Sequence, residues 1–248
     1  MSFALSAVAF VPGLAIGSFL NVVAARVPRK RSIVTPGSAC LSCGHELAWY
    51  ENVPVVSWLA LRGKCKGCGE RIGVVYPAVE LMTALLIAAS FLAFGWSGTS
   101  FVAAFFCATL VTVSATDLSH RIIPNVVVLP AAAVVLVAMT ALHPSAEWAL
   151  GAFGASLFLF LAALAYPKGM GMGDVKLALL LGAMLGRVVP VALMIGMLAA
   201  LVPSIVLFAR HGMAARKMGI PFGPFLAFGG VVALFFGDAV LDAYLGAF

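Results

Sequence analysis

Charged side chains are scarce in this sequence. Only 10% of its 248 residues are Asp, Glu, Lys or Arg, whereas 63% are hydrophobic and the mean hydropathy is +1.13. An ordinary soluble domain carries about a quarter charged residues, because its surface must face water. The composition therefore excludes a typical soluble domain and predicts that lipid surrounds most of the chain.

The apolar run before Arg26 also lacks basic side chains. A cleaved signal peptide begins with them, so this run predicts a retained helix with its N-terminus outside the cell. The positive charge follows instead: eight of the fifteen Lys and Arg residues lie between positions 26 and 71. Basic residues next to apolar spans are typical of a cytoplasmic loop, which explains them more simply than nucleic-acid binding does. We expect no nucleic-acid partner.

Apolar stretches account for most of the remaining chain. Eight spans are predicted, at residues 3–25, 77–94, 100–116, 123–142, 148–166, 174–185, 188–209 and 222–245. They predict an all-α polytopic membrane protein of about eight transmembrane helices. Its parts would be the first helix (1–25), a cytoplasmic cysteine-containing loop (26–76) and a transmembrane core (77–248).

The sixth span is too short to cross a bilayer alone. Twelve residues form about 18 Å of helix, against a hydrocarbon core of about 30 Å. A glycine-rich segment with Gly169, Gly171 and Gly173 flanks its start, and we expect these glycines to adopt unusual dihedrals and to let a substrate backbone approach. Such a segment must lie inside protein or beside water, where membrane proteins often place their working sites.

Two acids lie at predicted inner ends of spans. Asp117 closes the third span in ATDLSHRIIPN, and Asp174 opens the sixth in GMGDVK. Neighbouring carboxyl groups share one proton and can act together as acid and base on a peptide bond. The alternative is that each Asp only caps a helix end. We expect the pair to be catalytic, with Lys176 reaching toward head groups or biasing the local charge.

Four cysteines form two closely spaced pairs in the basic loop. The pattern is CxxC…CxxC, in which Cys40-x-x-Cys43 is followed by Cys65-x-x-Cys68. This spacing predicts a tetrahedral structural zinc site built from two knuckles. Nearby glycines would supply the tight turns: Gly44, Gly67 and Gly69. Disulfides or plain thiols are the alternatives, but a cytoplasmic loop is reducing. Cys107, in the third span, is expected to be a packing residue.

Several separated motifs resemble the type IV prepilin leader peptidase and N-methyltransferase family of GxGD intramembrane aspartyl proteases. They occur in the expected order: GSFLNVVAARVPR from Gly17, the cysteine loop, YPAVEL from Tyr76, ATDLSHRIIPN, GMGDVK, and PFGPFLAFGG from Pro221. Asp117 and Asp174 match the family's catalytic positions. The chain departs from the pattern at Asn125, where many members with a cysteine loop have Asp.

The resemblance implies an activity, partners and a location. Members cleave the basic leader of prepilins and pseudopilins after a Gly, at the cytoplasmic face of the bacterial inner membrane, for type IV pili or type II secretion. Members with the cysteine loop commonly also methylate the new N-terminus with S-adenosylmethionine. Glu80 occupies a position linked with methyltransfer, although it could instead be a polar contact between helices. Membrane lipid is the other expected partner, through the basic loop.

Three other functions remain open at this point. A proton-coupled transporter also uses intramembrane acids and broken helices, but it would show repeated halves, and we find no repeat. A zinc-loop scaffold without catalysis would tolerate loss of both aspartates. A peptidase without methyltransfer is the third, since the sequence has no glycine-rich nucleotide-binding turn of the usual kind.

Overall fold

The computed structural model describes residues 2–166, 170–212 and 219–246. These residues form helices and short turns, without a β-strand among them. The main helices are α1 (Ser2–Arg26), α3 (Val75–Phe94), α4 (Gly98–His120), α5 (Asn125–Leu142), α6 (Glu147–Ala165), α7 (Met172–Leu185), α8 (Val189–His211) and α9 (Gly223–Leu245). The predicted all-α architecture is confirmed.

Seven helical stretches in the described residues are long and apolar enough to cross a membrane. The count differs from the predicted eight because α7, the 3-10 helix η2 (Gly186–Val188) and α8 follow one another directly. Together they form one stretch of 40 residues, Met172–His211. This length exceeds the roughly 20 residues that one crossing needs, so the predicted sixth and seventh spans share a single helical stretch.

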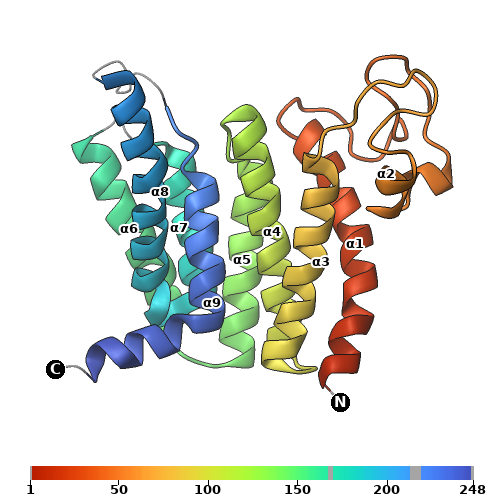
Figure 1. The fold of residues 1–248 in the computed structure, drawn as a ribbon. Coiled ribbons are helices and arrows are strands. Elements are labelled where there is room, and N and C mark those ends of the chain that lie inside the picture. Colours follow the sequence, from red (N-terminus) through yellow and green to blue (C-terminus); the bar gives the residue numbers. More distant parts are fainter. Residues whose placement is uncertain (1, 167–169, 213–218, 247–248) are drawn as a thin grey trace. The chain divides into compact units, whose positions relative to one another are not determined.

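The chain divides into two compact units, residues 1–115 and 116–248. In the first unit α1 lies along α3 (Figure 1). Gly13 and Gly17, one helical turn apart, allow this close packing. A Cβ on either glycine would lie within 3 Å of the Cα atom of Ala84 or Glu80 on α3. Small residues at this spacing are typical of helices that associate inside membranes.

The loop between α1 and α3 carries two short helices, η1 (Trp49–Asn52) and α2 (Val56–Ala60). It also contains two isolated antiparallel bridges, Ala39 to Glu46 and Lys64 to Arg71. Figure 1 shows this loop beside the upper ends of α1 and α3. A segment with so little regular structure needs other means of holding its shape.

The second unit packs α5, α6 and α9 against α7. Beginning at Asp174, nearly every residue of α7 is buried. The prediction that this short helix lies inside protein is therefore confirmed. Glycines allow the close approach: a Cβ on Gly151 of α6 would lie 2.8 Å from the carbonyl oxygen of Gly182 of α7.

Candidate active site

Asp117 lies in the last turn of α4 and is buried. Its Oδ2 atom accepts a hydrogen bond of 2.9 Å from the backbone N–H of Gly223. Gly223 is the first residue of α9, where backbone N–H groups have no partner within the helix. A Cβ at this position would lie 2.8 Å from Asp117 Oδ2, so only glycine lets the carboxylate come this close. The start of α9 thus holds the first acid in place.

Asp174 is the third residue of α7 and is also buried. Its Oδ2 atom accepts a hydrogen bond of 3.1 Å from the N–H of Gly171, the N-cap residue. This contact is a helix cap, the alternative considered for each aspartate. The cap engages one of the two carboxylate oxygens. Capping therefore accounts for only part of this side chain.

Ile123, just before α5, connects the two acidic segments. A Cβ on Gly173 would lie 2.9 Å from Ile123 Cβ, and a Cβ on Gly223 would lie 3.3 Å from Ile123 Cδ1. The starts of α7 and α9 therefore meet on one side chain. Gly173 directly precedes Asp174 and Gly223 is bonded to Asp117, so this contact brings the two acidic segments side by side. The structure brings the two predicted residues together, and their catalytic role stays a prediction.

The glycines before Asp174 act differently from the prediction. Gly171 has an extended backbone, with φ −83° and ψ 147°, and Gly173 is helical, so neither adopts the unusual dihedrals that we expected. The close approach at Gly173 is made by Ile123. Gly169 lies outside the described residues. Lys176 does not extend freely, because its Nζ atom donates a 2.9 Å hydrogen bond to Oδ1 of Asn125.

The cysteine pairs of the loop converge on one point. The Sγ atoms of Cys40, Cys43, Cys65 and Cys68 all lie within 4.8 Å of one another. Two separations are 3.8 Å, between Cys40 and Cys68, and 4.0 Å, between Cys43 and Cys65. Sulfur atoms arranged tetrahedrally around zinc, each about 2.3 Å from the ion, are about 3.8 Å apart. The four thiols therefore form a group that could hold a metal ion of this size.

The backbone repeats itself around the two cysteine pairs. The N–H groups of Cys40 and Cys65 donate to the carbonyl oxygens five residues later, at His45 and Glu70. After each pair comes a glycine with φ +74°, Gly44 or Gly69, in the left-handed region that glycine favours. Gly67 does not share this conformation. A Cβ at Gly67 would contact the His45 side chain at 3.2 Å, so its small size serves packing.

The four thiols do not share one acidity: although the N–H of Glu70 lowers the pKa of the Cys68 thiol, hydrogen bonds with the other thiols raise it to about 12. Backbone N–H groups of Cys43 and Ser42 lower the pKa of the Cys40 thiol to about 6. This thiol is therefore largely a thiolate at neutral pH, which is the form that coordinates metal. Cys107, in contrast, is fully buried among the apolar residues of α4, as predicted for a packing residue.

A buried acid that the sequence analysis did not identify supports the cysteine cluster. Glu51 accepts a hydrogen bond from the N–H of Ala48 (2.9 Å), and its Oε2 lies 3.0 Å from His45 Nε2. Its other oxygen lies 3.9 Å from Lys66 Nζ. The Ala48 N–H and the His45 contact lower the pKa of Glu51, which keeps it ionised. Because His45 follows the first cysteine pair and Lys66 lies within the second, Glu51 connects the two knuckles.

Glu80 is buried on α3 and connects this helix to the loop. Its Oε2 atom accepts a hydrogen bond of 2.7 Å from the N–H of Val55, the residue before α2. Val55 has φ +60°, a conformation that is strained for a β-branched residue. Glu80 therefore makes a polar contact, which was the alternative to a role in methyl transfer. Its partner, however, is the loop and not another helix.

Comparison with known proteins places the chain among leader peptidases. Residues 11–94 match the Bacterial Peptidase A24 N-terminal domain, and residues 104–208 match the Type IV leader peptidase family. A prepilin leader peptidase/N-methyltransferase of Bacillus subtilis (strain 168) is 37% identical over 250 residues, covering 95% of this chain and 96% of that protein. The protein of that name from Pseudomonas aeruginosa is 35% identical and covers 94% and 91%.

A third relative matches a shorter region more strongly. The prepilin leader peptidase/N-methyltransferase of Myxococcus xanthus is 53% identical over 121 residues, which cover 49% of this chain and 36% of that protein. No solved structure matches the chain. Since the Bacillus and Pseudomonas relatives are matched along nearly their whole length, this chain belongs to the type IV leader peptidase family.

Proposed function

We propose that this protein cleaves the leader peptide of type IV prepilins and pseudopilins, with Asp117 and Asp174 as the catalytic pair. The observation that carries the proposal is that both aspartates are buried, and that the glycine before Asp174 and the glycine bonded to Asp117 both lie against Ile123. The relatives matched over nearly their whole length are named prepilin leader peptidase/N-methyltransferase. Together these findings favour a peptidase over a transporter or a scaffold.

The two acids divide the work of peptide hydrolysis. One carboxylate takes a proton from water, whose oxygen bonds to the carbonyl carbon of the scissile peptide, while the protonated acid donates its proton to the carbonyl oxygen. The tetrahedral intermediate then breaks its C–N bond as the departing amine takes up a proton from one acid, and a hydroxyl group of the intermediate returns its proton to the other acid. The bonds from Gly223 and Gly171 hold one oxygen of each acid and orient the other.

The charge pattern and the family support a proposal for the cellular location. We place the protein in the bacterial cytoplasmic membrane, with the aspartates near the cytoplasmic face, because the basic residues gather in the 26–76 loop. A prepilin has a basic leader in the cytoplasm and an apolar helix in the membrane. Its cleavage site would then lie at the depth of the acids.

The cysteine cluster would hold a structural zinc ion. Cys40, Cys43, Cys65 and Cys68 would be its ligands, and the ion would fix a loop that has little hydrophobic core of its own. The sulfur separations support this assignment.

We also propose that the protein methylates the new N-terminus, with the 26–76 loop and Glu80 as the candidate region. S-adenosylmethionine would supply the methyl group. The support is the relatives' printed names, since one oxygen of Glu80 is already bonded to Val55. The geometry of Glu80 therefore does not show how this residue would act on the methyl donor.

The test uses the purified full chain in lipid nanodiscs, mixed with a full-length prepilin. Mass spectrometry of the product should show loss of the leader up to its last glycine. Addition of S-adenosylmethionine should then raise the mass of the mature N-terminus by one methyl group. An intact prepilin after prolonged incubation, with a correctly folded protein, would contradict the proposal. Cleavage without the mass increase would support the proposed peptidase activity and contradict the proposed methyltransferase activity.

A further inference from the structure

The short helix α2 exposes apolar side chains of the kind that a soluble protein buries. Val56 and Leu59, three residues apart and so on one face, are 60% and 62% exposed. The side-chain polar atoms of α2 have partners within the loop: Ser57 Oγ donates to Val53 O (2.7 Å), and Trp58 Nε1 donates to Ile72 O (3.0 Å). An apolar face turned outward on a helix with satisfied polar groups indicates an apolar surrounding.

The depth of α2 relative to the membrane is fixed by its bond to α3. Val55, immediately before α2, is bonded directly to Glu80, the sixth residue of α3. At about 1.5 Å per residue, Glu80 lies about 8 Å along α3. The 20 residues of α3 span about 30 Å, which matches the hydrocarbon core, so both its ends reach the interface. The start of α2 is therefore held level with the first turns of a membrane-spanning helix.

The middle of α2 is held at a similar depth. Trp58 is bonded to Ile72, only three residues before α3 begins, a distance of at most about 10 Å along the chain. Between these points, Val74 and Val75 are 67% and 54% exposed. The exposed apolar surface thus continues from the start of α3, which reaches the interface, to the loop residues bonded to α2.

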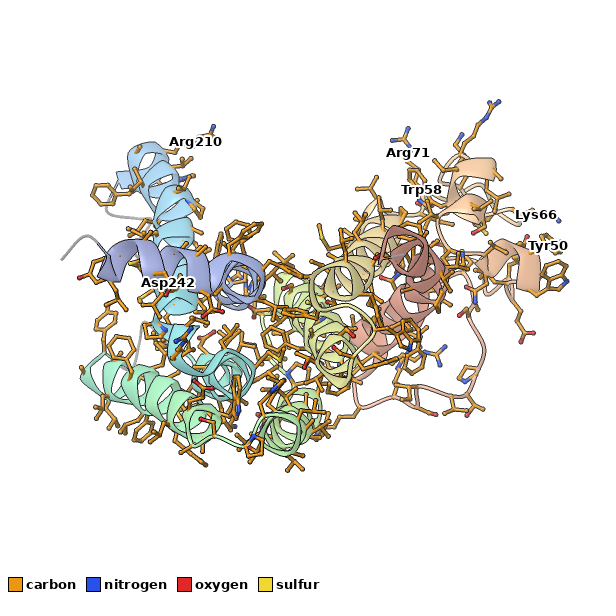
Figure 2. All side chains as sticks on the ribbon, turned by 90° about the horizontal axis from the view of Figure 1, so that it is seen from below. Tyr50, Trp58, Lys66, Arg71, Arg210 and Asp242 are labelled. Carbon is orange, nitrogen blue, oxygen red and sulfur yellow. The ribbon has the colours of Figure 1, made fainter. Side chains whose placement is uncertain are left out.

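Basic residues follow this apolar face in the sequence. Arg62 and Lys64 follow α2 directly, and both are exposed. Figure 2 shows Trp58 on the side of the loop nearer α1, and Tyr50 and Lys66 together at its far edge, where Lys66 Nζ donates a 2.8 Å hydrogen bond to Tyr50 Oη. Apolar side chains flanked by cations are typical of helices that lie in a membrane surface containing anionic phospholipid.

We propose that α2 lies in the membrane interface as an in-plane anchor for the cysteine loop. Val56 and Leu59 insert among the upper acyl chains of the leaflet that α3 enters. Arg62 and Lys64 bind the phosphates of anionic phospholipids there. The anchor holds Val55 and the cysteine pairs against the membrane surface, and it does not depend on the proposed leader-peptidase activity.

The experiment uses the full chain in nanodiscs whose phospholipid carries a diazirine in the upper acyl chain. After irradiation, mass spectrometry measures labelling of the peptide containing residues 56–61 and of a peptide from the start of α3. We expect both to be labelled to a similar degree in anionic nanodiscs, and the 56–61 peptide several-fold less in purely zwitterionic ones. A labelled α3 with an unlabelled 56–61 peptide would overturn the proposal and point to a protein partner. Equal labelling in both lipids would overturn the role of Arg62 and Lys64.

A pair of variants tests the face itself. Val56→Asp with Leu59→Asp should lower labelling of the α2 peptide about tenfold and leave α3 labelling unchanged, because charged side chains avoid the acyl region. Leu41→Asp is the matched control, since Leu41 is 84% exposed on the first cysteine pair. It should leave α2 labelling unchanged, and an equal loss in this variant would contradict a specific α2 anchor. Metal content at the wild-type level shows that each variant has folded.

Discussion

The cysteine loop and the aspartate site are stabilised in different ways. In the loop, residues 26–76, backbone turns, a buried Glu51 and four converging thiols hold a segment that has few apolar contacts. In residues 116–248, glycines let helices approach until the Asp117 carboxylate reaches the N–H at the start of α9, while Asp174 accepts from the N-cap of its own helix. The difference suggests a division of labour: cleavage should depend on the second region, and metal binding and methylation on the first.

The largest expected effect is on the aspartates. Asp117→Asn or Asp174→Asn should lower the rate of leader cleavage about a thousandfold or more, because the amide cannot take or give the shared proton. Metal content should stay at the wild-type level. Prepilin cleavage in nanodiscs measures the first and elemental analysis the second. Asp238→Asn is the control, since Asp238 pairs with Arg187 at an exposed position (2.7 Å). A similar loss in that variant would remove the special role of the pair.

The next effect concerns the glycine that holds Asp117. Gly223→Ala puts a methyl group 2.8 Å from Asp117 Oδ2, so the carboxylate must move. Cleavage should fall about 10- to 100-fold, as expected when a catalytic group is displaced by part of an ångström. Gly154→Ala on α6 is the matched control, because nothing lies within 4 Å of a Cβ there. Unchanged kcat in Gly223→Ala would mean that this hydrogen bond does not position the acid.

Loss of the metal should affect the cysteine loop much more than cleavage by the aspartate site. Cys65→Ser should reduce bound zinc from about one ion per chain to near zero and make the loop sensitive to proteases, because a structural site needs all four ligands. Cleavage should fall by less than about threefold. Cys107→Ser tests a cysteine outside the cluster and should keep its metal. If cleavage disappears with the zinc, the division of labour is wrong.

The smallest effect on cleavage is expected at Glu80. Glu80→Ala leaves the Val55 N–H without its acceptor and should lower N-terminal methylation about tenfold, with cleavage within about twofold. Glu80→Gln keeps an acceptor and should retain methylation within about threefold. The ratio of methylated to unmethylated product, measured by mass spectrometry, decides between positioning and chemistry. Equal loss in both variants would indicate that the carboxylate itself takes part in methyl transfer.

The difference between the two regions also explains which of their features could be predicted from the sequence. The cysteine ligands lie in one short stretch, from Cys40 to Cys68, so their spacing alone predicted the cluster, and the apolar runs predicted the helices. The aspartates were identified from their place at the ends of apolar runs. Their partners were not, because Gly223 is 106 residues from Asp117 and a backbone N–H leaves no trace in side-chain chemistry. Glu51 was missed for a similar reason, since nothing local marks an acid as buried.

The most direct test of the central claim is a double-mutant cycle on the two acids. Single-turnover leader cleavage is measured for Asp117→Asn, Asp174→Asn and the variant with both changes. If the carboxylates work as one unit, the double variant retains the same residual rate as each single variant, because either change already abolishes the shared proton. Losses that multiply in the double variant, or a single variant that cleaves at nearly the wild-type rate, would contradict the account.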